Sequence, residues 1–120
     1  MKPDKVLVVD DSKLMHRMYE VMLRNYTLVD AYDGREAVDA LRQQDDIDLV
    51  LLDINMPNMT GLEVLEELGR DDRVHPPVVI VSTEGREEDT QRGLEAGAVA
   101  YIKKPFQSDQ LMRIIESIEG

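Results

Sequence analysis

The stretch Asp48-Leu49-Val50-Leu51-Leu52-Asp53-Ile54-Asn55-Met56-Pro57 decides the fold of this chain of 120 residues. Its four consecutive aliphatic residues are typical of a strand that is buried on both faces of a sheet. The run ends on Asp53 and passes at once into a turn that contains Pro57 and Gly61. Ligands and reactive groups collect at the carboxyl edge of open parallel α/β sheets. We therefore expect Asp53 to lie at the functional edge of the sheet.

Four further segments have the length and composition of strands, namely Lys5 to Asp10, Thr27 to Tyr32, Val78 to Val81 and Val99 to Ile102. Segments of helical composition separate the strands, and one more follows the last strand. This alternation predicts an α/β fold with a doubly wound, five-stranded parallel sheet and five helices on both of its faces. The length is that of one ordinary domain, so residues 1–120 are expected to form a single unit.

Capping residues and apolar stripes locate the helices. Asp11 or Ser12 can cap the first helix, Gly97 is a plausible end for the fourth, and Ser108 can cap the last. Two stripes with helical spacing are expected to face the core. They consist of Leu14, Met18, Val21 and Met22 in the first helix and of Leu111, Ile114, Ile115 and Ile118 in the last.

The composition excludes several classes of function. The formal net charge is −11, which argues against nucleic acid as a direct partner and favours small cations or basic protein surfaces. Cysteine is absent, so disulfides and thiolate metal sites are excluded. No apolar run approaches the ~20 residues of a membrane span, and the start of the chain lacks the apolar segment of a signal peptide, so we expect a cytoplasmic protein without membrane contacts.

Reactive groups end four of the five expected strands. Asp10-Asp11 end the first, Asp53 the third, Ser82-Thr83 the fourth and Lys103-Lys104 the fifth. In a parallel sheet these ends share one edge, where three carboxylates would repel one another unless a cation intervenes. Mg²⁺ fits, because it binds oxygen ligands and commonly uses one or two carboxylates together with phosphate oxygens. A lysine can then pair with a phosphoryl oxygen, and Asp53 is the best candidate for a carboxylate nucleophile that becomes an acyl phosphate.

Each of these signals also has an ordinary structural explanation. An acidic pair before a helix often only caps it, a strand-terminal aspartate is often a turn residue, and Ser82-Thr83 can cap the next helix. A Lys-Pro pair often starts a solvated loop. The functional interpretation is favoured because all four signals fall at matching strand ends, which unrelated capping needs would not arrange.

Four motifs contain these residues: Val-Val-Asp10-Asp11-Ser12, Leu-Leu-Asp53-Ile-Asn-Met-Pro57-Asn-Met-Thr-Gly61, Val-Ser82-Thr83-Glu84 and Tyr101-Ile-Lys-Lys104-Pro105-Phe106. With them, nearly the whole chain resembles the receiver domain of bacterial two-component response regulators, in particular the single-domain CheY-like type. The resemblance implies the flavodoxin-like strand order 2-1-3-4-5. It also implies a phosphorylation-activated signalling switch, not an enzyme in the ordinary sense, with intrinsic Mg²⁺-dependent autophosphorylation and autodephosphorylation.

The resemblance also assigns the acidic residues and one lysine. Asp53 would be the phosphoacceptor, and together with Asp11 it would bind Mg²⁺ directly. Asp10 would help through water, and Asn55 would add its backbone carbonyl. Lys104 would pair with the phosphoryl oxygens through a loop whose Lys104–Pro105 peptide is cis, whereas Lys103, on the alternate face of its strand, would be an ordinary surface lysine.

Switching would involve the fourth and fifth strands. Ser82 would hydrogen-bond the phosphoryl group and move toward it, and the Thr83 amide could join it. Tyr101 would change rotamer and alter the surface of the fourth helix, fifth strand and fifth helix, although a half-buried strand tyrosine needs no such role. Asn55 and Glu84 match positions that tune the lifetime of the phosphoryl group. His16 and His75 match no functional position and are interpreted as surface residues.

The expected partners are a sensor histidine kinase and a downstream target protein that the sequence does not name. Chemotaxis or motility is one pathway that the resemblance suggests. The chain is expected to be a monomer or a weak dimer.

Two other functions compete. A phosphatase or phosphotransferase of the haloacid dehalogenase kind also forms an aspartyl phosphate, but it usually has a second acid two positions after the nucleophile. Here Ser12 follows Asp10 at that spacing, and Asn55 follows Asp53. A nucleotide or flavin binder would need a phosphate-binding first turn, yet residues 10–13 lack glycine and carry two negative charges.

Overall fold

The computed structural model describes residues 4–56, 59–70, 75–83 and 85–119 of the chain. Five parallel strands form one sheet in the order β2-β1-β3-β4-β5, which confirms the predicted topology and leaves β2 at an edge. The strands are β1 (Lys5–Val9), β2 (Thr27–Ala31), β3 (Leu49–Asp53), β4 (Val78–Ser82) and β5 (Ala100–Lys103). Every residue of β3 and β4 is buried, as their aliphatic runs indicate.

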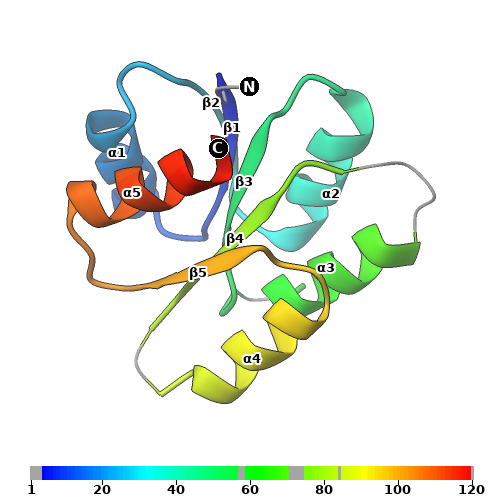
Figure 1. The fold of residues 1–120 in the computed structure, drawn as a ribbon. Helices are drawn as coiled ribbons and strands as arrows, with labels where there is room; N and C mark the ends of the chain where they lie inside the picture. Colours follow the sequence, from blue (N-terminus) through cyan, green and yellow to red (C-terminus); the bar gives the residue numbers. More distant parts are fainter. Residues whose placement is uncertain (1–3, 57–58, 71–74, 84, 120) are drawn as a thin grey trace.

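Five helices cover both faces of the sheet, as predicted. They are α1 (Lys13–Met22), α2 (Gly34–Gln43), α3 (Gly61–Arg70), α4 (Glu87–Glu95) and α5 (Ser108–Glu119). Figure 1 shows α1 and α5 together on one side of the sheet and α2, α3 and α4 on the other. No helix within the described ranges is long and apolar enough to cross a membrane.

The alternation of side chains along the strands divides the core in two. On the side of α2, α3 and α4 lie Leu7, Val9, Val50, Leu52, Val78 and Ile80. On the side of α1 and α5 lie Val6, Val8, Leu49, Leu51, Val79, Val81 and Ile102. Since successive residues of a strand point to opposite faces, this division also fixes the face on which each strand-end residue lies.

Most helix ends follow the predicted signals. The Ser12 side chain accepts a hydrogen bond from the Met15 backbone N–H at 3.3 Å and caps α1. Gly97 follows the end of α4 with φ 118°, in the left-handed region that suits glycine. The predicted cap at Ser108 is displaced by one residue, because Ser108 already belongs to α5 and the Gln107 N–H donates to the Gln110 side chain. Pro57 and Glu84 lie outside the described residues.

The predicted inward stripe of α1 is largely wrong. Leu14 and Val21 are 67% and 63% exposed, and Met18 is also exposed. Only Met22 of that stripe packs against the core. The buried residues of this segment are His16, Tyr19 and Leu23, so the interpretation of His16 as a surface residue is wrong as well. A pattern based on purely apolar residues misses this face, because tyrosine and histidine combine a buried ring with polar atoms that find partners.

Candidate functional site

Three carboxylates meet at the carboxyl edge of the sheet. Asp10 follows β1 directly, Asp11 comes next, and Asp53 is the last residue of β3. Each offers an oxygen atom within 4.8 Å of the others. Asp10 and Asp53 are only 1% and 5% exposed, whereas Asp11 is exposed to solvent. The strand-end argument therefore correctly predicted that these acids lie together.

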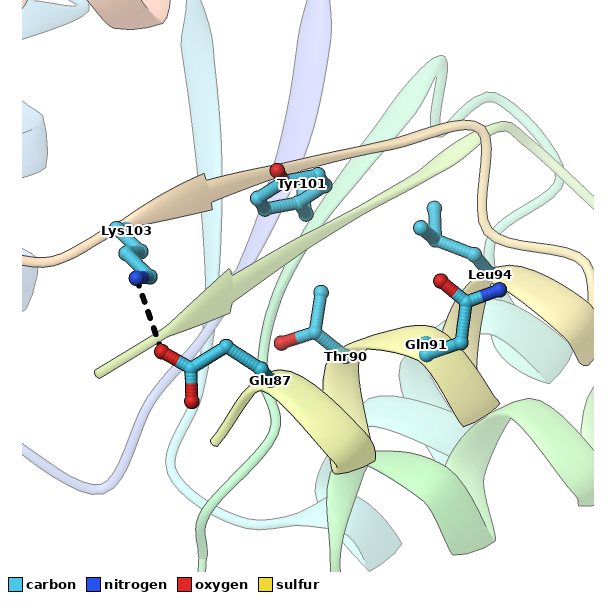
Figure 2. Close-up of a pocket in the computed structure, with 6 residues that line it drawn as sticks. All are labelled: Glu87, Thr90, Gln91, Leu94, Tyr101 and Lys103. Carbon is cyan, nitrogen blue, oxygen red and sulfur yellow. Dashed lines mark hydrogen bonds and ion pairs between the residues drawn. The ribbon is translucent and has the colours of Figure 1, made fainter. Parts of the chain in front are cut away.

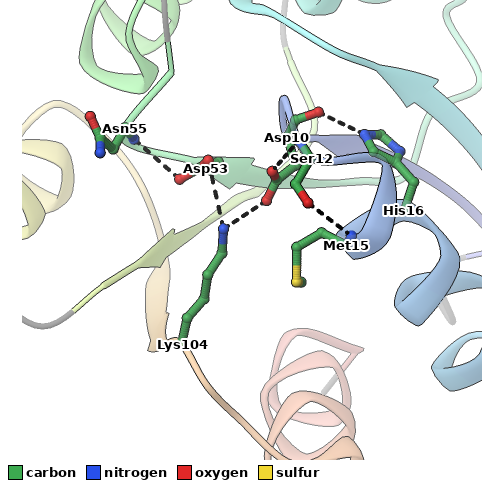
Figure 3. A network of polar contacts seen from close by, with 7 residues as sticks. All are labelled: Asp10, Ser12, Met15, His16, Asp53, Asn55 and Lys104. Carbon is green, nitrogen blue, oxygen red and sulfur yellow. Dashed lines mark hydrogen bonds and ion pairs between the residues drawn. The ribbon is translucent and has the colours of Figure 1, made fainter.

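Hydrogen bonds hold the two buried carboxylates in place (Figure 3). One oxygen of Asp10 accepts from the Ser12 backbone N–H at 2.8 Å. The Oδ1 atom of Asp53 accepts from the Asn55 backbone N–H at 3.1 Å. Each acid thus folds back over the residue two positions later, an arrangement that aspartate readily adopts at the start of a turn.

Lys104 brings a positive charge between the two buried acids. Its Nζ atom lies 2.8 Å from Asp10 Oδ2 and 3.7 Å from Asp53 Oδ2. Its backbone N–H donates to the Ser82 carbonyl at 2.6 Å, which ties the lysine loop to the end of β4. The Lys104–Pro105 peptide is cis, as the resemblance implied.

The neighbouring lysine points away from this site. Lys103 lies on the opposite face of β5, is exposed, and its Nζ atom is 3.0 Å from Glu87 Oε1 on α4. The pair with Lys103 lowers the pKa of the Glu87 carboxyl. Strand alternation thus distinguishes the two lysines, with Lys104 on the side of the acids and Lys103 on the side of α4.

Asp53 is electrostatically unusual. Burial raises the pKa of its carboxyl to about 6 from an ordinary value of 3.8. The ammonium group of Lys104 and the Asn55 amide lower the pKa of Asp53, while the charges of Asp10 and Asp11 raise it further. The positive charge of Lys104 therefore does not fully offset the rise in the pKa of Asp53 that burial and the two neighbouring acids cause. A set of three close carboxylate oxygens with a shortage of positive charge suits a hard divalent cation.

The fourth and fifth strands contribute the other predicted residues. Ser82 ends β4 and is buried, while Thr83 is exposed beside Lys104 and Pro105 in an apolar groove of about 320 Å³. Tyr101 of β5 is 49% exposed. Figure 2 shows it above Thr90 of α4, in a pocket of about 200 Å³ that Leu94 and Lys103 also line. Ser82 and Tyr101 therefore lie on the α4 face of the sheet.

The comparisons with known proteins agree with this geometry. Residues 6–116 match the family model described as a response regulator receiver domain. The chain belongs to this family. The resemblance inferred from the four motifs is thereby confirmed, and the chain is a receiver domain of the two-component signalling family. The haloacid dehalogenase alternative is not favoured.

Relatives and solved structures support the assignment. The receiver domain is 34% identical to the chemotaxis protein CheY homolog of Campylobacter jejuni, over 97% of this chain and 92% of that protein. It is 35% identical to the transcriptional regulatory protein CpxR of Escherichia coli, over 96% of this chain but 49% of that protein, so it spans about half the length of CpxR. The structure of Vibrio cholerae chemotaxis protein CheY4 matches with a TM-score of 0.86 and 31% identity, covering 97% of this chain and 98% of that one.

Sequence reasoning missed one residue of this receiver domain that touches the acidic cluster. His16 is 2% exposed, and its Nε2 atom lies 2.7 Å from the backbone carbonyl oxygen of Asp10. Its Nδ1 atom lies 2.6 Å from Asp30 Oδ1 (Figure 3 shows the contact to Asp10). A usable signal was present, because His16, Tyr19 and Leu23 keep helical spacing as a second stripe on α1.

Proposed function

We propose that residues 1–120 act as one phosphorylation-activated signalling switch and that Asp53 accepts a phosphoryl group from a sensor histidine kinase. The observation that carries the proposal is the surroundings of Asp53. Its buried carboxylate lies beside the Lys104 ammonium group and two further acids, at the carboxyl edge of the sheet. Few roles other than binding a cation and transferring a phosphoryl group explain such a concentration of buried charge.

In the proposed transfer, an oxygen of the ionised Asp53 attacks the phosphorus atom of a phosphohistidine. The new O–P bond forms as the P–N bond to the donor histidine breaks, which leaves an aspartyl phosphate on this chain. Lys104 lies near enough to both acids for its ammonium group to pair with the phosphoryl oxygens after the transfer. The work of the protein is thus positioning and charge neutralisation, and attack by water on the same phosphoryl group would reverse the modification slowly.

The acidic cluster fits Mg²⁺ by the chemistry of its oxygen donors. Asp11 and Asp53 would hold the ion directly, Asp10 through water, and Asn55 through its backbone carbonyl. When bound, Mg²⁺ would supply positive charge to the oxygens of the transferred group. Asp11 is the exposed member of the cluster, so its carboxylate is available to a hydrated ion that arrives from solvent.

The output of the switch is proposed to be a changed surface on α4, β5 and α5. Ser82 would hydrogen-bond the phosphoryl group with help from the Thr83 amide, and Tyr101 would then change rotamer. The exposed position of Tyr101 beside α4 leaves room for that change. Phosphorylation would thereby favour one of two pre-existing states and recruit a target protein. Asn55 and Glu84 would tune how long that state lasts.

Chemotaxis is one pathway in which this switch could act, since one relative of almost the same length is a chemotaxis protein. A cytoplasmic location and a monomeric or weakly dimeric state also belong to the proposal.

The decisive experiment uses acetyl phosphate as a small phosphodonor. The chain should gain one phosphoryl group by intact-protein mass spectrometry when Mg²⁺ is present and none when EDTA is added. Asp53→Asn should remove the modification, and Asp39→Asn, on the exposed side of α2, is the matched control and should leave it intact. Labelling that persists in Asp53→Asn would show that the nucleophile has been misidentified.

A further inference from the structure

The backbone of Asp10 is held from both sides by elements that carry none of the proposed phosphoryl chemistry. Its N–H donates to the Ala31 carbonyl of the edge strand β2 at 3.1 Å. Its carbonyl lies 2.7 Å from Nε2 of His16 on α1. A carbonyl oxygen only accepts hydrogen bonds, so Nε2 of His16 carries the proton and donates it to Asp10.

A second contact fixes the orientation of the His16 ring. The carboxylate of Asp30, also on β2, lies 2.6 Å from the other ring nitrogen. The ring of Tyr32 packs against the imidazole, with 4.3 Å between ring centroids and 33° between ring planes. Hydrogen bonds at both nitrogens and packing on one face allow this buried ring a single position.

The two sides of Asp10 are therefore linked. Its carboxylate oxygens bind the Ser12 N–H and the Lys104 ammonium group, while its carbonyl binds His16. Without the histidine, the Asp10 carbonyl would be buried without that partner, and the peptide would be free to rotate toward another donor. The side chain of Asp10 turns with its backbone, so such a rotation would displace the Asp10 carboxylate. Its distances to the carboxylate oxygens of Asp11 and Asp53, now within 4.8 Å, would change.

We propose that His16 is a positioning residue of the acidic cluster, and that its Nε2–H bond to the Asp10 carbonyl sets the affinity of the cluster for Mg²⁺. The inference rests on the proposed Mg²⁺ site and extends it to β2, the strand that ends without a reactive group. His16 touches neither the ion nor the phosphoryl group. It acts through the backbone of Asp10, as residues behind metal ligands commonly do.

Two isosteric substitutions separate the contacts of His16. The amide nitrogen of glutamine occupies the place of Nε2, so His16→Gln keeps the bond to Asp10. The amide nitrogen of asparagine occupies the place of Nδ1, so His16→Asn keeps the contact to Asp30 and loses the bond to Asp10. We expect His16→Asn to raise the dissociation constant for Mg²⁺ about tenfold, and His16→Gln to stay within about twofold of the wild type. Isothermal titration calorimetry without a phosphodonor measures both.

A spectroscopic signal provides a readout that requires no metal. The ¹³C resonance of the Asp10 carbonyl reports the hydrogen bond that it accepts. In the metal-free protein this resonance should move in His16→Asn and in His16→Leu, and should remain near its wild-type position in His16→Gln. Leu23→Ala serves as a control for general loosening of α1, because it removes a buried side chain without touching Asp10 and should leave Mg²⁺ affinity unchanged.

The inference is overturned if His16→Asn binds Mg²⁺ as the wild type does, or if the asparagine and glutamine variants weaken binding equally. If His16→Asn folds poorly, His16→Leu provides the same test, because leucine also lacks a hydrogen-bond donor. Asp11→Ala identifies a failure of the underlying metal site. If Asp11→Ala binds Mg²⁺ normally, the proposed Mg²⁺ site is wrong, and so is the effect of His16 on metal affinity. In that case the Asp10 carbonyl resonance decides the positioning role, which is rejected if the resonance does not move in His16→Asn.

Discussion

At the scale of single residues, Asp53 is a buried acid whose charged form is disfavoured in the folded domain. Its folded-state pKa is about 6, whereas the ordinary value of 3.8 applies to the unfolded chain. The folded protein thus holds this proton more tightly than the unfolded chain does. The contribution of Asp53 to stability is fully present below pH 3.8 and is lost as the pH rises to about 6, after which it stays lost.

Replacing Asp53 should therefore stabilise the metal-free protein at neutral pH. We expect Asp53→Asn to raise the free energy of unfolding at pH 7.5 by about 1–3 kcal/mol, because asparagine removes a buried charge while keeping an oxygen for the Asn55 N–H. The gain should shrink between pH 6 and pH 4. Urea unfolding followed by circular dichroism in EDTA measures it. An equal gain at pH 4 and pH 7.5 would contradict the assigned cause.

The site residues differ in how well a sequence can identify them. Asp10, Asp53 and Lys104 could be predicted because each directly follows or ends a recognisable strand. Helical spacing could have indicated that His16 is buried, but not its role, because that role depends on a backbone carbonyl and on a carboxylate from a strand that ends without any reactive group. Contacts of this kind arise from tertiary structure and leave no local pattern beyond helical spacing.

At the scale of elements, α1 shows how an apolar stripe can mislead. The exposed stripe is Leu14, Met18 and Val21, while Tyr19 and Leu23 are buried. Burial raises the pKa of the Tyr19 hydroxyl, because the charged form is disfavoured in the core. Its ring lies 6.3 Å, between centroids, from that of Phe106. The sequence therefore predicted that the helix exists and where it begins, but not its rotation about its axis.

The corrected face of α1 can be tested by substitution. Leu14→Gln and Val21→Lys should change the free energy of unfolding by no more than about 0.5 kcal/mol, because both side chains are already exposed. Leu23→Ala should cost about 2–5 kcal/mol, because it leaves a cavity in the core. Chemical unfolding of the three variants provides the comparison. If Leu14→Gln lowered the free energy of unfolding by more than about 2 kcal/mol, Leu14 would face the core, as the apolar stripe predicted.

Helix α3 contains two glycines with opposite roles. At Gly61, the first residue of α3, a Cβ atom would lie 2.6 Å from the backbone carbonyl oxygen of Asp53. At Gly69, near the other end of the same helix, such a Cβ would meet nothing within 4 Å among the described residues outside the nearby turns of the helix itself. The first glycine is thus required by the close approach of α3 to the end of β3, and the second is not.

Matched alanine substitutions should separate the two glycines. Gly61→Ala should destabilise the fold by about 1–3 kcal/mol through overpacking, and it should impair acetyl phosphate labelling, because it displaces the backbone that carries Asp53. Gly69→Ala should add about 0.5–1 kcal/mol of stability and leave labelling unchanged, because alanine favours a helix. Thermal unfolding and mass spectrometry measure both effects. A stabilising Gly61→Ala would mean that α3 can move away from β3.

At the scale of the whole molecule, part of the negative charge lies in the buried interior, where it is least tolerated. The chain carries a formal net charge of −11, and two of its acids are buried beside each other with one shared lysine. The alternation of elements made the topology predictable, since consecutive strands in such a chain are parallel and their ends share one edge. The crowding of carboxylates at that edge could also be predicted, but the burial of Asp10 and Asp53 and the hydrogen bonds that hold them are seen only in the structure, because they depend on how the elements pack.

Millimolar Mg²⁺ should stabilise the folded protein, because a ligand that binds only the folded state raises the free energy of unfolding. At ten times the dissociation constant the gain is about 1.4 kcal/mol, or roughly 4–8 °C in melting temperature. Asp11→Ala should abolish the gain. KCl of matched ionic strength controls for general screening of the net charge, and an equal rise with K⁺ would exclude a specific site.

The division of the core by the sheet has a consequence for how such a protein can diversify. Asp10, Asp53 and Lys104 belong to the α1 and α5 face, whereas Ser82 and Tyr101 belong to the α4 face. Because the central strands are fully buried between two separate clusters, substitutions behind one face need little accommodation behind the other. Core residues behind one face can therefore be varied while those behind the other are kept, whereas Ser82 and Tyr101, which the proposed switch couples to Asp53, have to be varied together with it.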